Sequence, residues 1–323
     1  MSLTVAILIC AGGLYVGANI GANDAANCIG APVGAGLIRY RTAILTVALF
    51  VILGAVLQGA EVTKTLGKGI VTESISTWGV LTAMICGGLF VTIATFRKIP
   101  VSTSQAIVGA VAGVGVAGDL NVAWGKALTI LECWIICPVL TAVMTYLIYA
   151  GMRRVLARTG KGPRISAALR WAVIAASAYS AYSLGAGHLG MAIGPITAMD
   201  EQVIDHRLLV VLGSASIAAG AIFFGAGVAK TVGGSIVQLD LLGAFAVQAS
   251  LAFGLHAFAM AGIPVSSSQG VVGALMGIGL YHGIKAVSKR KIGEVVVGWI
   301  ATPSLAGLVA FGMYRLLLSF GLS

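Results

Sequence analysis

The sequence predicts an all-α polytopic membrane protein made of two inverted-topology repeats, with broken or re-entrant helices and about 10 or more membrane segments. Hydrophobic residues make up 59% of the 323 residues and charged residues only 9%, and the mean hydropathy is +1.02. Soluble domains carry roughly 25% charged residues. One hydroxyl-rich string also occurs twice, at 100–105 and at 264–269. A polar string repeated at half-chain spacing is typical of secondary transporters.

In the first half, five apolar stretches are long enough to cross a bilayer, which takes about 20 residues. They are 3–38, 42–60, 77–96, 100–118 and 122–150. The first stretch is interrupted by polar residues, so we expect a break or a hairpin inside it. No basic segment precedes it, which favours a membrane span over a signal peptide. We expect the second half to carry the counterparts of these spans. Whether 61–76 and 229–240 re-enter the membrane is left open by the sequence.

The spacing of the repeats divides the chain into three parts. A shift of 164 residues relates the two strings and also relates 21–24 to 185–188. A further pair, 62–67 and 228–233, matches at a shift of 166, which requires one small insertion. We therefore predict a first transmembrane repeat at 1–150, a basic cytoplasmic linker at 151–166 and a second, inverted repeat at 167–323.

Charge predicts that the two repeats are inverted. The basic loop 39–41 corresponds to the acidic loop 200–205, and the weakly charged loop 119–126 corresponds to the basic loop 285–291. Because cytoplasmic loops are enriched in Lys and Arg, matching loops are expected on opposite sides of the membrane. Six basic residues and no acidic one lie at 153–170, which indicates a cytoplasmic loop and not a nucleic-acid-binding patch. We expect a multi-pass protein of the cell membrane with both termini extracellular and no nucleic-acid partner.

Asn23, Asp24 and Asn27 form a polar group inside the first apolar stretch. A carboxylate at such a position costs roughly 2.5–3.5 kcal/mol on insertion scales unless it lines a cavity or binds a cation. The Gly and Asn content suits an unwound stretch whose carbonyl, amide and carboxylate oxygens coordinate a hard cation such as Na⁺. Asn23 and Asp24 are the principal predicted Na⁺ ligands. Capping of an adjacent half-helix is an alternative role for Asp24.

Each hydroxyl-rich string follows a proline and begins a Gly-rich apolar segment. A Ser or Thr at a helix start caps free N–H groups, and a helix N-terminus with further hydroxyls is suited to bind an anion. Two such ends facing each other would surround an oxyanion with donors. The predicted substrate-binding residues are Ser102, Thr103, Ser104, Gln105, Ser266, Ser267, Ser268 and Gln269.

At these residues the chain resembles the inorganic phosphate transporter (PiT) family, whose members carry a GANDxANA-type motif and a PVSTT-type motif in each of two inverted halves. Here 21–28 reads Gly-Ala-Asn-Asp-Ala-Ala-Asn-Cys, and 62–65 and 100–105 follow in the family's order. The resemblance covers nearly the whole chain. It implies Na⁺- or H⁺-coupled uptake of phosphate, with related members handling sulfate. It also implies that the string hydroxyls hold the oxyanion and that Asn23, Asp24 and Asn27 supply the cation site.

The chain departs from the family pattern in the second half. Gly185-Ala186-Gly187-His188 stands where a second Asn-Asp pair is expected, and Gln105 and Gln269 stand where many members have His. His188 titrates near neutral pH and is a candidate for carrying a proton or contacting the anion; a neutral structural histidine is the alternative. Because the second Asn-Asp pair is missing, the number of Na⁺ ions transported with each phosphate cannot be transferred from the family.

The leading functional prediction is a secondary active transporter that imports inorganic phosphate by Na⁺ symport through alternating access. The alternative is a proton-coupled permease for sulfate or a similar tetrahedral oxyanion, and an anion channel is a third possibility. The chain lacks motifs such as H-E-x-x-H and G-x-S-x-G, so we expect no enzyme activity. We expect no cofactor other than Na⁺ or H⁺ as coupling ion. The lipid bilayer and a second copy in a homodimer are the expected partners.

Overall fold

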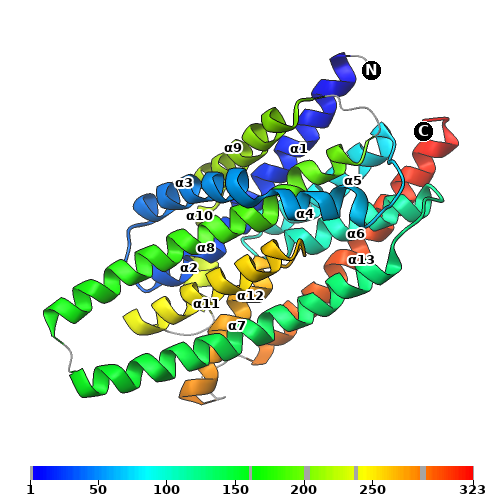
Figure 1. Cartoon of the computed structure of the whole chain (residues 1–323). Coiled ribbons are helices and arrows are strands. Elements are labelled where there is room, and N and C mark those ends of the chain that lie inside the picture. Colours follow the sequence, from blue (N-terminus) through cyan, green and yellow to red (C-terminus); the bar gives the residue numbers. More distant parts are fainter. Residues whose placement is uncertain (1–2, 160–161, 200–203, 236–238, 284–288, 323) are drawn as a thin grey trace.

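The structure is a long bundle of helices (Figure 1). It is a computed structural model that describes residues 3–159, 162–199, 204–235, 239–283 and 289–322. Within these ranges the β-pairing consists of one isolated bridge between Val71 and Val122. The prediction of an all-helical protein is confirmed for the described residues.

The first half of the chain contains seven α-helices and one short π-helix. They are α1 (Leu3–Asn23), α2 (Ala25–Gly34), α3 (Tyr40–Gln58), α4 (Ala60–Lys64), η1 (Thr65–Gly69), α5 (Thr77–Phe96), α6 (Thr103–Ala117) and α7 (Trp124–Thr159). The described part of the second half adds six more helices. They are α8 (Pro163–Thr197), α9 (His206–Phe224), α10 (Ala226–Ser235), α11 (Leu241–Met260), α12 (Ser267–His282) and α13 (Lys289–Ser319).

Seven helical segments among the described residues are long and apolar enough to cross a membrane. They are Leu3–Gly34, Tyr40–Gln58, Thr77–Phe96, Trp124–Arg158, His206–Phe224, Leu241–Met260 and Val296–Ser319. α6 has 15 residues and α12 has 16, which is shorter than a full span. The total of about 10 or more membrane segments therefore stays a prediction.

The predicted element boundaries agree closely with the structure in some places and differ in others. The span expected at 77–96 is α5 with the same bounds. The span expected at 122–150 is longer, because α7 continues to Thr159 and α8 begins at Pro163. Most of the predicted linker 151–166 is therefore helical. Arg153, Arg154, Arg158 and Arg164 lie exposed on the surfaces of these two helices.

The segment 61–76 packs against α8 through α4 and η1. Its end is held by backbone hydrogen bonds to the loop before α7: Thr72 N donates to Asn121 O at 3.0 Å and Ala123 N donates to Ile70 O at 2.8 Å. In the second half, α10 packs against α2, and residues 236–238 lie outside the described residues. Whether either segment re-enters the membrane stays open.

Glycines allow very close contact between the helices of the two halves. A Cβ at Gly21 of α1 would overlap the carbonyl oxygen of Ile217 in α9, and a Cβ at Gly185 of α8 would overlap the carbonyl oxygen of Val51 in α3. Backbones that approach this closely stabilise membrane helix pairs by packing. Part of the high Gly content of the sequence therefore serves to let these helices cross closely.

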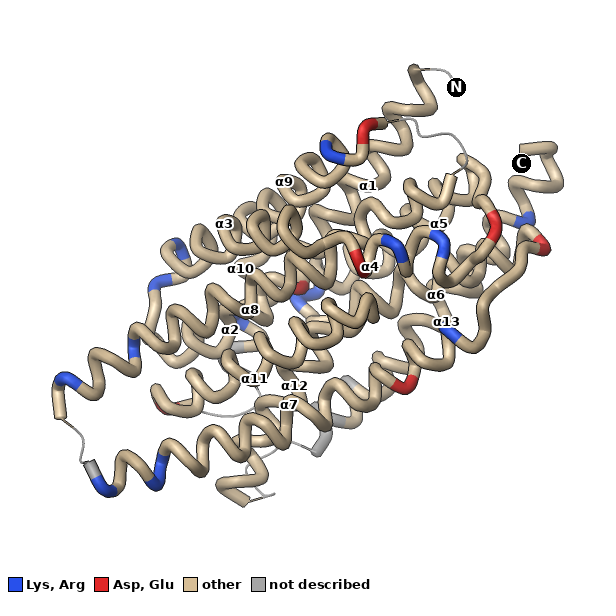
Figure 2. Tube along the Cα trace, in the orientation of Figure 1, with Lys and Arg blue, Asp and Glu red and all other residues tan. Residues whose placement is uncertain are grey.

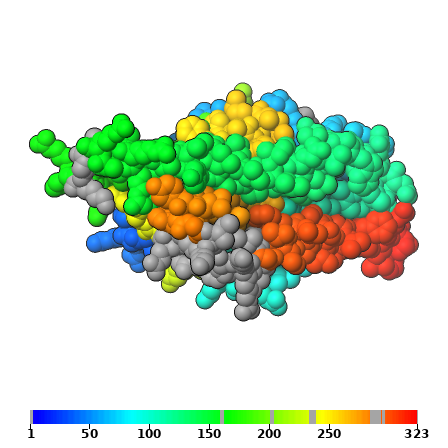
Figure 3. Space-filling model, turned by 90° about the horizontal axis from the view of Figure 1, so that it is seen from below, coloured from blue at the N-terminus to red at the C-terminus, as the bar shows by residue number. Residues whose placement is uncertain are grey.

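The outside of the bundle is apolar along its length. Figure 3 shows α7 running beside α12 and α13 over one face, and side chains such as Ile135, Leu147, Ile300 and Leu308 are exposed there. Figure 2 shows Lys and Arg gathered where α7 ends and α8 begins, whereas both signs of charge occur at the opposite end, which holds both termini. An exposed apolar belt between polar ends is typical of a protein that spans a membrane.

Candidate functional site

The break between α1 and α2 lies at Asp24. This residue keeps α-helical dihedral angles, φ −81° and ψ −32°, and its N–H donates to Ile20 O at 2.8 Å, as in a continuous helix. The expectation of an unwound stretch is therefore wrong, because the backbone at Asp24 stays helical where α1 gives way to α2. In the second half, α8 runs as one helix through His188, the residue that corresponds to Asp24. The break is a feature of the first half.

The two hydroxyl-rich strings form matching helix caps. Ser102 Oγ accepts from Gln105 N at the start of α6, and Ser266 Oγ accepts from Gln269 N at the start of α12, both at 3.2 Å. A second hydroxyl contacts each cap: Ser104 lies 3.1 Å from Ser102 and Ser268 lies 2.8 Å from Ser266, measured between Oγ atoms. Ser and Thr are favoured at these positions because they accept from N–H groups of the first turn.

The caps leave other donors of the first turn free. The first four N–H groups of a helix have no partner within the helix, and each cap serves only the Gln N–H. In the described part of the chain, the N–H groups of Thr103, Ser104, Ser267 and Ser268 make no hydrogen bond. Free N–H groups at the positive end of a helix dipole are suited to bind an anion.

Asp24 and Asn27 contact the second string directly. Ser267 Oγ donates to Asp24 Oδ1 at 2.7 Å, and Asn27 Nδ2 donates to Ser267 Oγ at 2.9 Å. The strings also touch each other, because Ser268 Oγ donates to the backbone oxygen of Val101 at 3.1 Å. Asp24 and Asn27 therefore form one cluster with the hydroxyls of the second string, although they lie 243 and 240 positions from Ser267 in the sequence.

The Asp24 carboxylate has no basic counterion among the described residues. It is fully buried, and its Oδ2 atom has no hydrogen-bond partner among the described residues, nor has Asn27 Oδ1. The salt bridges of the described residues, Lys64 with Glu61 and Arg315 with Asp119, involve largely exposed side chains elsewhere. A carboxylate and an amide oxygen with free lone pairs are ligands that a hard cation prefers. The described residues contain no cluster of three His, Cys, Asp or Glu side chains that would hold a transition metal.

Asn23 has a different environment from the other two polar residues of its motif. Its Nδ2 group donates to Thr95 Oγ1 at 3.0 Å and to Ile99 O at 3.1 Å, and its Oδ1 accepts from Val101 N at 3.0 Å. These bonds tie α1 to the loop before α6. Asn23 therefore positions the first string, and its predicted role as a cation ligand stays a prediction.

Gln105 and Gln269 are buried, yet they line a cavity of about 860 Å³ whose lining includes neither Asp24 nor the hydroxyl residues of the strings. The cavity lies between α7 and α13, and its other walls are mainly apolar, with Trp134 and Trp299 among them. The carboxamide oxygens of both glutamines lack partners in the described structure. Their predicted contact with substrate stays a prediction.

His188 is buried within α8, with 1% of its surface exposed. Neither ring nitrogen reaches hydrogen-bond geometry with a described residue, although the Leu184 carbonyl one helical turn earlier faces the ring. A proton or anion contact at His188 stays a prediction.

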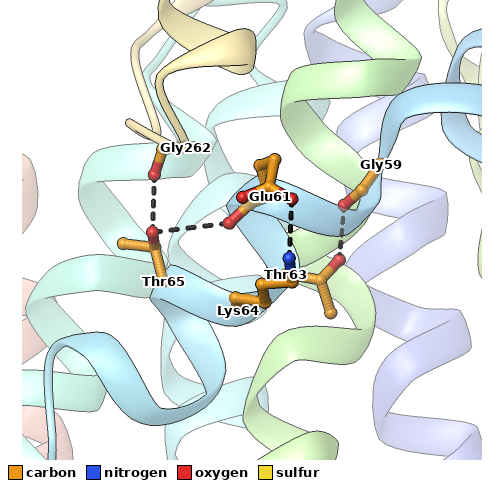
Figure 4. Close-up of polar contacts among 6 residues, drawn as sticks. All are labelled: Gly59, Glu61, Thr63, Lys64, Thr65 and Gly262. Atoms are coloured by element: carbon orange, nitrogen blue, oxygen red, sulfur yellow. Dashed lines mark hydrogen bonds and ion pairs between the residues drawn. The ribbon is translucent and has the colours of Figure 1, made fainter.

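The sequence did not reveal three residues of the site: Trp134 and Thr65 hold the loop of the second string, and Gln248 bonds the backbone of Asn27. Trp134 Nε1 donates to Pro264 O at 2.9 Å, and Thr65 Oγ1 donates to Gly262 O at 2.6 Å (Figure 4). Gln248 Nε2 donates to Asn27 O at 3.2 Å. Thr65 lies in the segment 62–67, whose repetition in the second half could have pointed to it. Trp134 and Gln248 lie in apolar helices and carry no comparable local pattern.

Comparison with known proteins gives consistent results at the level of sequence and structure. The sequence model described as "Phosphate transporter family" matches residues 20–310. The chain is 27% identical to a "putative phosphate permease" of Pyrococcus abyssi, over 94% of this chain and 96% of that protein. It is 26% identical to a protein of the same description from Methanocaldococcus jannaschii, over 92% and 93% of the two chains. A solved structure titled "The sodium-dependent phosphate transporter" aligns with a TM-score of 0.88 at 26% identity, over 98% of this chain and 100% of that one.

Proposed function

This chain belongs to the phosphate transporter family, and we propose from that premise that it imports inorganic phosphate together with Na⁺ by alternating access. One observation carries the proposal. Asp24 is fully buried with no basic counterion in the described part of the chain, and it bonds through Ser267 to the helix end that would hold the anion. A cation bound at Asp24 and an anion bound at the strings would each reduce the electrostatic cost of burying the other.

The Asp24 carboxylate beside the two strings favours phosphate over sulfate. Free N–H groups and hydroxyls from two helix ends suit any tetrahedral oxyanion. Monohydrogen phosphate can also donate a hydrogen bond to a nearby carboxylate such as Asp24, whereas sulfate has no proton to donate and is repelled. The family match supports the same choice.

Burial of the strings supports alternating access over a channel. The eight residues from Ser102 to Gln105 and from Ser266 to Gln269 are each at most 3% exposed. A substrate bound there is enclosed by protein, so it can enter and leave only if the surrounding helices move. A channel would instead need a continuous polar path.

Paired contacts support two inverted repeats. Gly21 of the first half approaches Ile217 of the second, and Gly185 of the second half approaches Val51 of the first. Equivalent glycines thus make equivalent contacts with the opposite half. α6 runs from the centre toward the end where Asp119 pairs with Arg315, whereas α12 runs toward the end where His282 contacts Tyr149 (Figure 1). Two matching helices that run in opposite directions are what inverted repeats produce.

The distribution of charge supports an orientation in the cell membrane. Arg153, Arg154, Arg158, Arg164 and Arg170 are exposed at one end of the bundle, and both termini lie at the other (Figures 1 and 2). The positive-inside rule then puts the end with the arginines in the cytoplasm and the termini outside. A homodimer formed through the apolar exterior completes the proposal.

Uptake into proteoliposomes tests the function. We expect radiolabelled phosphate to accumulate under an inward Na⁺ gradient and radiolabelled sulfate not to do so. A second experiment measures uptake of both anions under a pH gradient without Na⁺ and compares the wild type with His188→Gln. Proton-driven sulfate uptake that ignores Na⁺ and is lost in His188→Gln would replace this proposal with the sulfate permease.

A further inference from the structure

The Ser267 hydroxyl group is fully engaged in the described structure. It donates to Asp24 Oδ1 at 2.7 Å and accepts from Asn27 Nδ2 at 2.9 Å. A serine hydroxyl has a single proton to donate. While that proton is bonded to the Asp24 carboxylate, Ser267 cannot donate it to an anion.

Thr103 is the residue that corresponds to Ser267 in the first string, and its hydroxyl group lies near the same carboxyl group. Thr103 Oγ1 faces the Asp24 carboxyl group but reaches hydrogen-bond geometry with no described residue. The residues that correspond to Asp24 and Asn27 are His188 and Met191, and neither forms a hydrogen bond with Thr103. The two strings are alike in their caps, but Ser267 donates to Asp24 whereas Thr103 does not reach hydrogen-bond geometry with it.

We propose that Ser267 links cation binding to anion binding by passing its single hydroxyl hydrogen bond from Asp24 to the anion. A cation at Asp24 takes over stabilisation of the carboxylate, and Ser267 then rotates to donate to the oxyanion. No covalent bond forms or breaks in this step. Thr103 donates to the anion with or without the cation. This inference rests on the proposed function for the identity of the anion and the cation.

Two consequences separate this role from simple binding. Without an anion, the hydroxyl of Ser267 competes with Na⁺ for the carboxylate, so its removal should raise the affinity for Na⁺. With an anion, Ser267 contributes a donor only when Na⁺ is present. Its removal should therefore reduce the factor by which Na⁺ increases phosphate affinity. By linkage, the same factor describes the effect of phosphate on Na⁺ affinity.

The first experiment measures binding of Na⁺ alone to the purified full chain. Tryptophan fluorescence is a suitable probe because Trp134 bonds the second string directly, and choline chloride keeps the ionic strength constant. We expect Ser267→Ala to bind Na⁺ at least about fivefold more tightly than the wild type. The reason is that the hydrogen bond from Ser267 to the charged Asp24 carboxylate no longer competes with Na⁺. Ser267→Thr, which keeps the hydroxyl and copies the residue of the first string, should restore the wild-type affinity. Weaker Na⁺ binding in Ser267→Ala would overturn the inference, since Ser267 would then be a cation ligand.

The second experiment measures radiolabelled phosphate binding with and without saturating Na⁺. We expect the ratio of the two dissociation constants to fall at least about fivefold in Ser267→Ala. In Thr103→Val, affinity should fall by a similar factor in both conditions, so that the ratio stays within about twofold of the wild type. An unchanged ratio in Ser267→Ala contradicts the inference while leaving Na⁺-coupled binding intact. Wild-type phosphate binding that ignores Na⁺ contradicts the proposed function, and the Na⁺ titration still decides the role of Ser267.

Discussion

At the scale of single residues, Asp24 determines the electrostatics of the site. A carboxylate at the centre of a membrane helix costs roughly 2.5–3.5 kcal/mol on insertion scales. Here one oxygen accepts from Ser267, and the other has no partner within the described structure. A bound cation would neutralise the carboxylate through this unpartnered oxygen.

Replacing Asp24 by Asn removes this charge and keeps an oxygen that can accept from Ser267. We expect Asp24→Asn to fold as well as the wild type or better, since a buried charge is lost. Phosphate uptake in proteoliposomes should lose its dependence on Na⁺. Asp119→Asn is the matched control, because Asp119 is exposed and its salt bridge with Arg315 is worth little. If Asp24→Asn keeps the Na⁺ dependence of the wild type, Asp24 is not the coupling residue.

At the scale of elements, the second string is positioned by the first half of the chain. Gly262 has a positive φ of +68°, which a glycine adopts without strain, and its carbonyl accepts from Thr65 at 2.6 Å. Trp134 Nε1 donates to the carbonyl oxygen of Pro264 in the same loop. The place of α12 therefore depends on η1 and α7, although these elements are far away in the sequence.

Replacing Thr65 by Val deletes the hydroxyl and preserves the shape of the side chain. The buried Gly262 carbonyl then loses its partner, which costs about 1–3 kcal/mol. We expect a lower melting temperature in detergent and a higher KM for phosphate, because the second string is held less firmly. Thr129→Val is the control, since the exposed Thr129 hydroxyl bonds only within its own helix, to Gly125 O. Equal effects of the two substitutions would remove Thr65 from the support of the string.

At the scale of the whole molecule, the long helices α7 and α8 set the orientation. Both extend into the basic region at one end, while the chain termini lie at the other (Figure 1). The five cysteines are unpaired, and four of them are buried. They can therefore be replaced to give a background for site-specific labelling.

Membrane-impermeant maleimide labelling of intact cells checks the orientation. In a cysteine-free background that still takes up phosphate, Leu322→Cys should be labelled and Arg158→Cys should be protected until the cells are opened. The physical reason is the positive-inside rule, which places the arginine-rich end in the cytoplasm. The reverse pattern would invert the proposed topology, and labelling of both sites would show that they share the outer side.

Much of the architecture followed from local patterns in the sequence. Hydropathy determined the membrane class and the bounds of α5, because apolar length and lipid thickness are directly related. The repeated strings predicted two helix starts with Ser caps, and Ser102 and Ser266 form them at equal distances. The polar group around Asp24 predicted an unwound stretch, whereas the structure divides α1 from α2 at Asp24 and keeps the backbone there helical.

Only the tertiary structure decided which of these polar groups meet. Capping and helix length depend on near neighbours, whereas the bond from Ser267 to Asp24 joins residues that are 243 positions apart. The two hydroxyls that match in sequence, Thr103 and Ser267, both lie near Asp24, but only Ser267 reaches hydrogen-bond geometry with its carboxylate. Asn23 likewise turns toward the loop before α6. The sequence determined the kinds of groups placed in the membrane, and packing of the two halves determined which hydroxyl lies against the buried charge.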